Sequence, residues 1–132
     1  RFLLEAMEQA SRGAFAEEPR PTKNLTIEHI MPQGWRENWP LETGMTSVDR
    51  DRIVHTIGNL TLLNGKLNLY QSNRPWLDPD ESGQGKRTNL AAHTVLALNK
   101  PICEVENWTE AEIKSRSSVL FALALQTWPR PV

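Results

Sequence analysis

The chain has 132 residues, enough for one domain with a modest hydrophobic core, and its formal net charge of −1 excludes a globally basic nucleic-acid binder. Residues 50–100 carry 7 Lys and Arg against 4 Asp and Glu, and they are the only third of the chain with a positive balance. The single cysteine, Cys103, excludes an internal disulfide and a cysteine-rich zinc site, and no apolar run approaches the roughly 20 residues of a membrane span.

The first predicted element is an amphipathic helix over residues 2–17, where apolar residues recur at spacings of three and four. Pro19 and Pro21 end it, because proline lacks an amide donor and disfavours helix in the residue before it. The helical pattern begins directly after Arg1, so we expect a fragment of a longer protein. A first strand is predicted over residues 25–31.

The segment that follows this strand is irregular but rich in tryptophan. Trp35 and Trp39 are expected to pin it to the core, and an exposed surface that stacks bases is the alternative. After this segment, Ser47 is the predicted N-cap of a short helix over residues 48–56.

A second strand and a short helix are predicted next. Gly58 ends the preceding helix, and residues 60–63 form an apolar strand. A helix over residues 65–72 is expected to present Leu67 and Tyr70 to the core.

The last third of the chain is predicted to be helical. A surface loop over residues 78–85 precedes a helix over residues 86–98. Thr109 and Glu112 form a capping box, which opens a helix that runs to about Thr127. One face of that helix is expected to be buried, and it carries Ile113, Val119, Leu120, Ala124 and Trp128.

Four polar side chains on the two strands and the short helix suggest a phosphodiesterase site. An imidazole with a pKa of about 6.5 accepts a proton near neutrality, so His29 is the candidate general base. A hard cation binds through one or two protein oxygens and keeps several waters, so Glu28 and Asn68 are the candidate metal ligands. The carboxamide of Asn59 is expected to brace the loop around His29 or to orient its imidazole.

Each of these residues also has a structural interpretation. A histidine close to a proline is more often structural than catalytic, and Glu28 fits a solvated strand residue. Asn59 fits an ordinary turn residue, and Asn68 fits a helix surface. The ordered combination of the four is what favours a catalytic site.

The combination resembles a known family, the HNH branch of the His-Me finger nucleases. More closely, it resembles the C-terminal nuclease domain of GmrSD-type restriction enzymes, which also occurs in SspE-type effectors of phosphorothioate-dependent phage defence. The residues that carry the resemblance are Ile27-Glu28-His29-Ile30-Met31-Pro32-Gln33, Trp35, His55-Thr56-Ile57-Gly58-Asn59-Leu60-Thr61-Leu62-Leu63, Asn68, Asn73 and Lys86.

The resemblance implies a fold and a set of roles. The fold is expected to be α+β, with a mainly helical domain over residues 1–132 around a small ββα-metal core at about residues 25–73. His29 is implied as the general base, Asn59 as the middle residue of the HNH triplet, and Asn68 as the third residue, which contacts the metal. Glu28 stands where many relatives have a metal-binding Asp, and Asn68 favours Mg²⁺ or Mn²⁺ over zinc.

The implied substrate is double-stranded DNA, cut or nicked as part of bacterial defence against phage. An N-terminal NTPase module of the same protein belongs to the same expectation. The single cysteine fits a reducing cytoplasm, and the lack of a long apolar run predicts no membrane contact. Double-strand cutting by one such site would favour a homo-oligomer or successive nicks. Contacts with DNA phosphate are predicted for five residues that flank the site: Lys66, Arg74, Lys86, Arg87 and His55. For His55, a structural role is favoured over a phosphate contact.

Two other functions remain open at this point. One is a catalytically silent DNA-binding or sensing module attached to an NTPase. The other is a helical protein-interaction domain that binds its partner through a Trp-rich surface.

Overall fold

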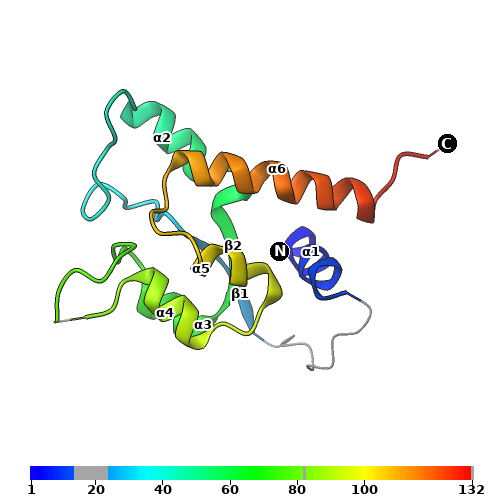
Figure 1. Cartoon of the computed structure of the whole chain (residues 1–132), viewed down its shortest axis with the longest axis horizontal. Coiled ribbons are helices and arrows are strands. Elements are labelled where there is room, and N and C mark those ends of the chain that lie inside the picture. The colour runs from blue at the N-terminus through cyan, green and yellow to red at the C-terminus, as the bar shows by residue number, and fades with distance from the viewer. Residues whose placement is uncertain (14–23, 82, 132) are drawn as a thin grey trace.

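The computed structural model describes residues 1–13, 24–81 and 83–131. In this part of the chain the fold is α+β and mostly helical, as predicted, with a two-stranded antiparallel sheet near the centre (Figure 1). The strands are β1 (Leu25–His29) and β2 (Leu60–Asn64). The helices are α1 (Phe2–Arg12), α2 (Ser47–Val54), α3 (Gly65–Gln71), α4 (Lys86–His93), α5 (Lys100–Cys103) and α6 (Glu110–Thr127), with 3₁₀ turns η1 (Ile57–Asn59) and η2 (Ala97–Asn99).

The sheet leads directly into a helix. β1 pairs with β2 so that Glu28 lies opposite Thr61 and His29 opposite Leu60. α3 begins at the residue after β2, and the side chain of Asn64 caps it by accepting a hydrogen bond from the backbone N–H of Leu67 at 2.9 Å. Two strands and a helix therefore form one continuous unit.

β1 is two residues shorter than predicted. Ile30 and Met31 leave the sheet because Asn59 takes their backbone hydrogen bonds. The N–H of Ile30 donates to the Asn59 backbone carbonyl at 2.9 Å, and the N–H of Met31 donates to its side-chain oxygen at 2.8 Å. Both apolar side chains are buried, so the strand ends at His29 by turning inward.

The sheet divides two hydrophobic cores. Leu62 and Leu63 are neighbours on β2 and point to opposite faces, and each joins a different buried cluster. The cluster around Leu62 lies under α1 and α6 and includes Leu4, Met7 and Leu120. The cluster around Leu63 contains most of the tryptophans and lies toward α2, α3 and α4. β2 is thus buried on both faces.

The tryptophans are core residues, as predicted for Trp35 and Trp39. These two are 3% and 6% exposed, and their indole N–H groups donate to Asp51 Oδ1 and to the backbone carbonyl of Arg74. Trp76 and Trp108 are also buried, and Trp128 is 40% exposed. The protein-interaction domain that binds its partner through a Trp-rich surface is therefore wrong for this fold.

Several element boundaries differ from the predictions. Thr46, not Ser47, is the N-cap of α2, because its hydroxyl accepts from the N–H of Asp49 at 3.1 Å. The helix predicted over residues 86–98 ends at His93, and the chain then forms η2. Glu8 of α1 holds η2 in place by accepting from the N–H groups of Ala97 and Leu98.

Some predicted buried residues are exposed. Tyr70 is 46% exposed, and the guanidinium of Arg74 lies over its ring. The capping box of Thr109 and Glu112 is confirmed. α6 buries Ile113 and Leu120 as predicted, whereas Val119 and Trp128 face outward. Of the predicted first helix, residues 14–17 lie outside the described residues.

α6 fixes the turn next to the predicted site. A Cβ at Gly58 would clash with the Ile113 carbonyl and the Ser117 hydroxyl, so η1 packs directly on the α6 backbone. The Gly58 N–H donates to Ser117 Oγ at 3.0 Å, and Arg116 donates to the carbonyls of Gly58 and Leu60 at 2.9 and 2.8 Å. These bonds hold the residue that precedes Asn59.

Candidate active site

A cleft of about 990 Å³ lies along β1 and α3 and contains four of the predicted site residues. They are Glu28, His29, Lys66 and Asn68. The remaining lining is mostly uncharged and rich in carboxamides: Asn24, Thr26, Pro32, Gln33, Asn64, Gly65, Leu69, Ser72 and Asn73. The cleft therefore offers polar donors and acceptors with one carboxylate and one exposed ammonium.

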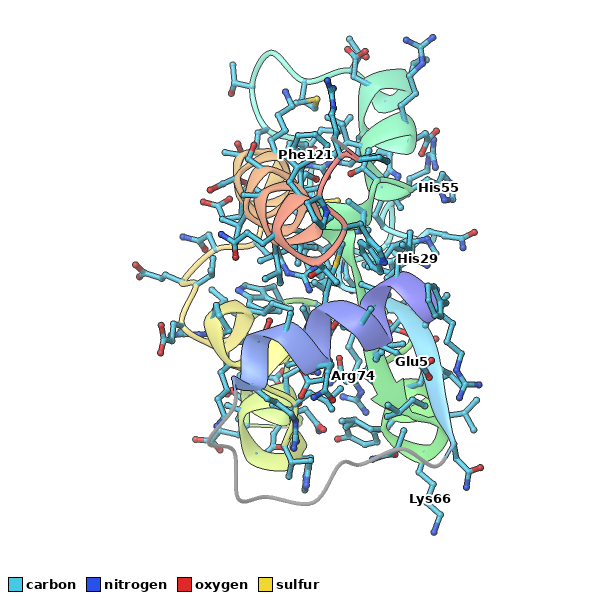
Figure 2. All side chains as sticks on the ribbon, turned by 90° about the vertical axis from the view of Figure 1, so that its right-hand side faces the viewer. Glu5, His29, His55, Lys66, Arg74 and Phe121 are labelled. Atoms are coloured by element: carbon cyan, nitrogen blue, oxygen red, sulfur yellow. The ribbon has the colours of Figure 1, made fainter. Side chains whose placement is uncertain are left out.

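His29 lies at the end of β1 with a half-buried imidazole. Figure 2 shows His29 and His55 on the same side of the molecule, with Lys66 toward its lower end. The two imidazoles meet edge to face with 5.4 Å between their centroids, and neither ring nitrogen of His29 has a hydrogen-bond partner among the described residues. Burial lowers the pKa of His29, and the nearby His55 and Lys86 lower it further. The imidazole is thus neutral, and able to accept a proton, at neutral pH.

Glu28 is buried and paired with Lys86. The carboxylate oxygen Oε1 accepts from the Lys86 ammonium at 2.6 Å, and the second oxygen, Oε2, has no hydrogen-bond partner in the described part of the chain. Burial raises the pKa of Glu28 and outweighs the opposing effect of Lys86. Burial likewise lowers the pKa of Lys86. Lys86 is 0% exposed, so its placement does not fit the predicted contact with DNA phosphate.

Asn59 lies behind the cleft and does not line it. It is 0% exposed, and its amide nitrogen donates to the carbonyls of Met31 and Val54 at 2.8 and 2.9 Å. Its oxygen accepts from the Met31 N–H at 2.8 Å and from the Trp108 indole at 3.1 Å. Asn59 therefore braces the segment just after His29, and its buried side chain does not reach the cleft.

Asn68 lies on α3 and faces β1. Its amide nitrogen donates to Thr26 Oγ1 at 2.8 Å and to the Ile27 carbonyl at 3.2 Å. The side-chain oxygen has no hydrogen-bond partner among the described residues. These two bonds set the carboxamide orientation and leave its oxygen as an acceptor at the edge of the cleft.

Of the five predicted DNA contacts, only Lys66 lines the cleft. His55 is exposed beside His29. Arg74 donates to the carbonyls of Tyr70 and Gln84, and Arg87 donates to the carbonyl of Cys103. Both arginines thus spend some of their five N–H donors on backbone carbonyls, and neither lines the cleft.

The donor set fits an oxygen-preferring divalent cation that is held by few protein ligands. Glu28 Oε2 and Asn68 Oδ1 are hard oxygens without hydrogen-bond partners, and both residues line the cleft. No cluster of three or more His, Cys, Asp or Glu suited to a metal occurs among the described residues. Mg²⁺ and Mn²⁺ keep several waters and so need few protein oxygens.

Comparison with known proteins decides the family. The family model of the C-terminal domain of GmrSD restriction endonucleases matches residues 1–123. The chain belongs to this family. Comparisons with curated proteins and with solved structures gave no match.

Membership of the GmrSD C-terminal domain family indicates a nuclease role in a restriction system. It also makes a nucleic-acid target and an N-terminal partner domain plausible. None of the helices in the described residues is long and apolar enough to cross a membrane.

Two features of the candidate site in this GmrSD domain were missed from the sequence. One is the pair of Lys86 with Glu28, although Lys86 belongs to the motif that carries the family resemblance and this was a usable signal. The other is the gathering of carboxamides in the cleft. Gln33, Asn68 and Asn73 belong to the same motif, whereas no sequence pattern indicated Asn24 and Asn64.

Proposed function

We propose that this domain is a metal-dependent DNA endonuclease that hydrolyses phosphodiesters with His29 as general base. The observation that carries the proposal is one cleft that contains a neutral imidazole, a carboxylate and a carboxamide oxygen, from His29, Glu28 and Asn68. Family membership supports the proposal, because it favours nuclease chemistry over other hydrolytic reactions.

In this proposal each residue has one task. His29 accepts the proton of the attacking water, and Asn59 fixes the backbone that presents the imidazole. Glu28 and Asn68 hold Mg²⁺ or Mn²⁺, which when bound neutralises charge on the phosphate and assists the leaving oxygen. Lys66 contacts the DNA backbone at the far end of the cleft.

The test is conversion of supercoiled plasmid to the nicked form in the presence of Mg²⁺ or Mn²⁺. We expect the parent to nick, and we expect EDTA or the His29→Ala substitution to abolish nicking. His93→Ala is the matched control, because His93 is exposed at the end of α4 and does not line the cleft. Nicking by His29→Ala at the parent rate would refute the assignment of the base.

A catalytically silent DNA-binding or sensing module is the second candidate. The observation that favours it is the bond between Lys86 and Glu28, because a carboxylate that is already paired attracts a cation less strongly. This candidate predicts salt-sensitive DNA binding without nicking in any divalent metal. Plasmid nicking that depends on His29 would exclude it.

The biological setting is also part of the proposal. The substrate is foreign double-stranded DNA, the compartment is the cytoplasm, and an N-terminal NTPase module of the same protein controls the nuclease. One such site cuts one strand at a time, so a double-strand break requires a homo-oligomer or two successive nicks. Linear product that accumulates only after the nicked form would indicate successive nicks.

A further inference from the structure

Lys86 bonds both Glu28 and His29, two residues that line the cleft, and it lies 58 residues after Glu28 in the sequence. It is the first residue of α4 and is 0% exposed. Its ammonium donates to Glu28 Oε1 at 2.6 Å and to the backbone carbonyl of His29 at 3.0 Å. Lysine is seldom fully buried, and a buried ammonium persists only where it is paired.

The support for this ammonium is rigid. The N–H groups of Lys86 and Arg87 donate to the carbonyls of Pro75 and Trp76 at 2.9 and 3.0 Å. The N–H of Gly85 donates to Asp78 Oδ1 at 2.6 Å, and a Cβ at Gly85 would clash with the carbonyl of the residue before Asp78. The start of α4 is therefore held on both sides, and the Lys86 side chain extends from a fixed point.

We propose that Lys86 is a positioning residue that fixes the Glu28 carboxylate and the His29 peptide, so that both side chains line the cleft. The inference rests on the proposed nuclease function. The Lys86 ammonium bonds both Glu28 and His29, so it resists a displacement of either residue. Lys86 itself does not line the cleft, and its place in the chemistry is indirect.

The alternative is a direct contact with DNA phosphate, and two properties separate the roles. A phosphate contact contributes about one unit to the slope of log K against log salt. A positioning residue leaves that slope unchanged and lowers the cleavage rate, by about 10–100-fold for residues that orient a metal site.

The experiment compares three lysine-to-methionine variants of the chain. DNA binding is measured in EDTA over a salt series, and single-turnover nicking is measured with the protein in saturating excess over DNA and at saturating metal. We expect Lys86→Met to keep the parent slope and lose about 10–100-fold in rate. We expect Lys66→Met to reduce the slope by about one. Lys114→Met, an exposed lysine on α6, is the control and should change neither quantity.

A second measurement does not depend on activity. The edge-to-face contact of His29 and His55 gives an NMR cross-peak between their ring protons, and Glu28→Gln should keep it, because Lys86 still bonds the His29 carbonyl. The double variant Glu28→Gln with Lys86→Met leaves no buried charge unpaired, so it should fold. We expect it to lose or shift the cross-peak.

The outcomes separate the two proposals. An unchanged cross-peak in the double variant, an unchanged rate in Lys86→Met, or a slope reduced by one in that variant would each overturn the role of Lys86. A parent chain that never nicks DNA would refute the proposed function, and the histidine cross-peak would still decide what Lys86 does.

Discussion

Asn59 shows how one residue braces the candidate site from outside the cleft. A carboxamide has two donors and two acceptor positions, and all four are used at 0% exposure. Its partners come from the segment after β1, from the end of α2 and from Trp108. Aspartate lacks the donors, leucine lacks donors and acceptors, and glutamine holds the same groups one methylene farther from the backbone.

Substitution of Asn59 should therefore destabilise the fold. In Asn59→Ala, backbone groups of Met31 and Val54 and the Trp108 indole become buried without partners, and each such group costs about 1–3 kcal/mol. We expect the free energy of unfolding to fall by about 3–5 kcal/mol in urea denaturation. Asn107→Ala, at an exposed site, is the control and should stay within about 0.5 kcal/mol. Equal stabilities would show that the bonds of Asn59 contribute nothing net.

A plot of cleavage rate against pH should fall on its acid side, called the acid limb, where the imidazole of His29 becomes protonated. Its pKa is lowered, so the neutral base persists below pH 6.5, and the rate should fall only at a lower pH than for an ordinary histidine. His55→Ala removes one of the charges that lower this pKa, and it should move the acid limb to higher pH. Single-turnover rates from pH 5 to pH 8 measure the shift. A limb that moves to lower pH in His55→Ala would contradict the role of His29.

At the scale of elements, the site depends on how η1 packs against α6. Arg116 and Ser117 bond the backbone around Gly58, and the absence of a side chain at Gly58 lets the turn approach the helix. The last helix is thus remote from the cleft in sequence but determines where Asn59 lies.

Gly58→Ala tests this packing. The added methyl group would clash with the α6 backbone, and overpacking of this kind costs about 1–3 kcal/mol. We expect a loss of about 3 kcal/mol in the free energy of unfolding, together with weaker nicking. Gly65→Ala is the control, because a Cβ there meets nothing within 4 Å and alanine favours helix by about 0.5–1 kcal/mol. Similar unfolding midpoints for the two variants would show that the approach of η1 to α6 is not tight.

Local patterns predicted the elements well where a single physical rule decides them. The apolar runs gave β2 and the start of α3, and the capping box of Thr109 and Glu112 gave the start of α6. The end of α4 was missed, because the apolar spacing continues past His93 while Asn99 and Glu8 draw the chain into η2. Tertiary hydrogen bonds overrode the periodicity there.

At the scale of the whole molecule, the sheet separates two cores, and a polar cleft lies along β1 and α3. The wide sequence separation of the contacting groups explains what could not be predicted. Glu28 and Lys86 are 58 residues apart, and Asn59 and Trp108 are 49 apart, so no local pattern reports that they meet. The candidate base and ligands were predicted because their side-chain chemistry suits phosphodiester hydrolysis and because they occur in a family motif.

The positions of the positively charged side chains also could not be predicted from the sequence. The middle third of the chain has the positive balance, which suggested a phosphate-facing surface. In the fold, Lys86 is buried, and Arg74 and Arg87 bond backbone carbonyls. Lys66 is the remaining predicted lysine or arginine contact that lines the cleft. Net charge along the sequence therefore overestimated the cationic surface at the site.

The most direct test of the central claim, that the imidazole of His29 removes the proton from water, is chemical rescue. His29→Gly should leave a space at the cleft and abolish nicking in Mg²⁺. Added imidazole should restore the rate in proportion to its unprotonated concentration, while His93→Gly with or without imidazole stays at the parent rate. A His29→Gly variant that nicks as fast as the parent without imidazole would contradict the account.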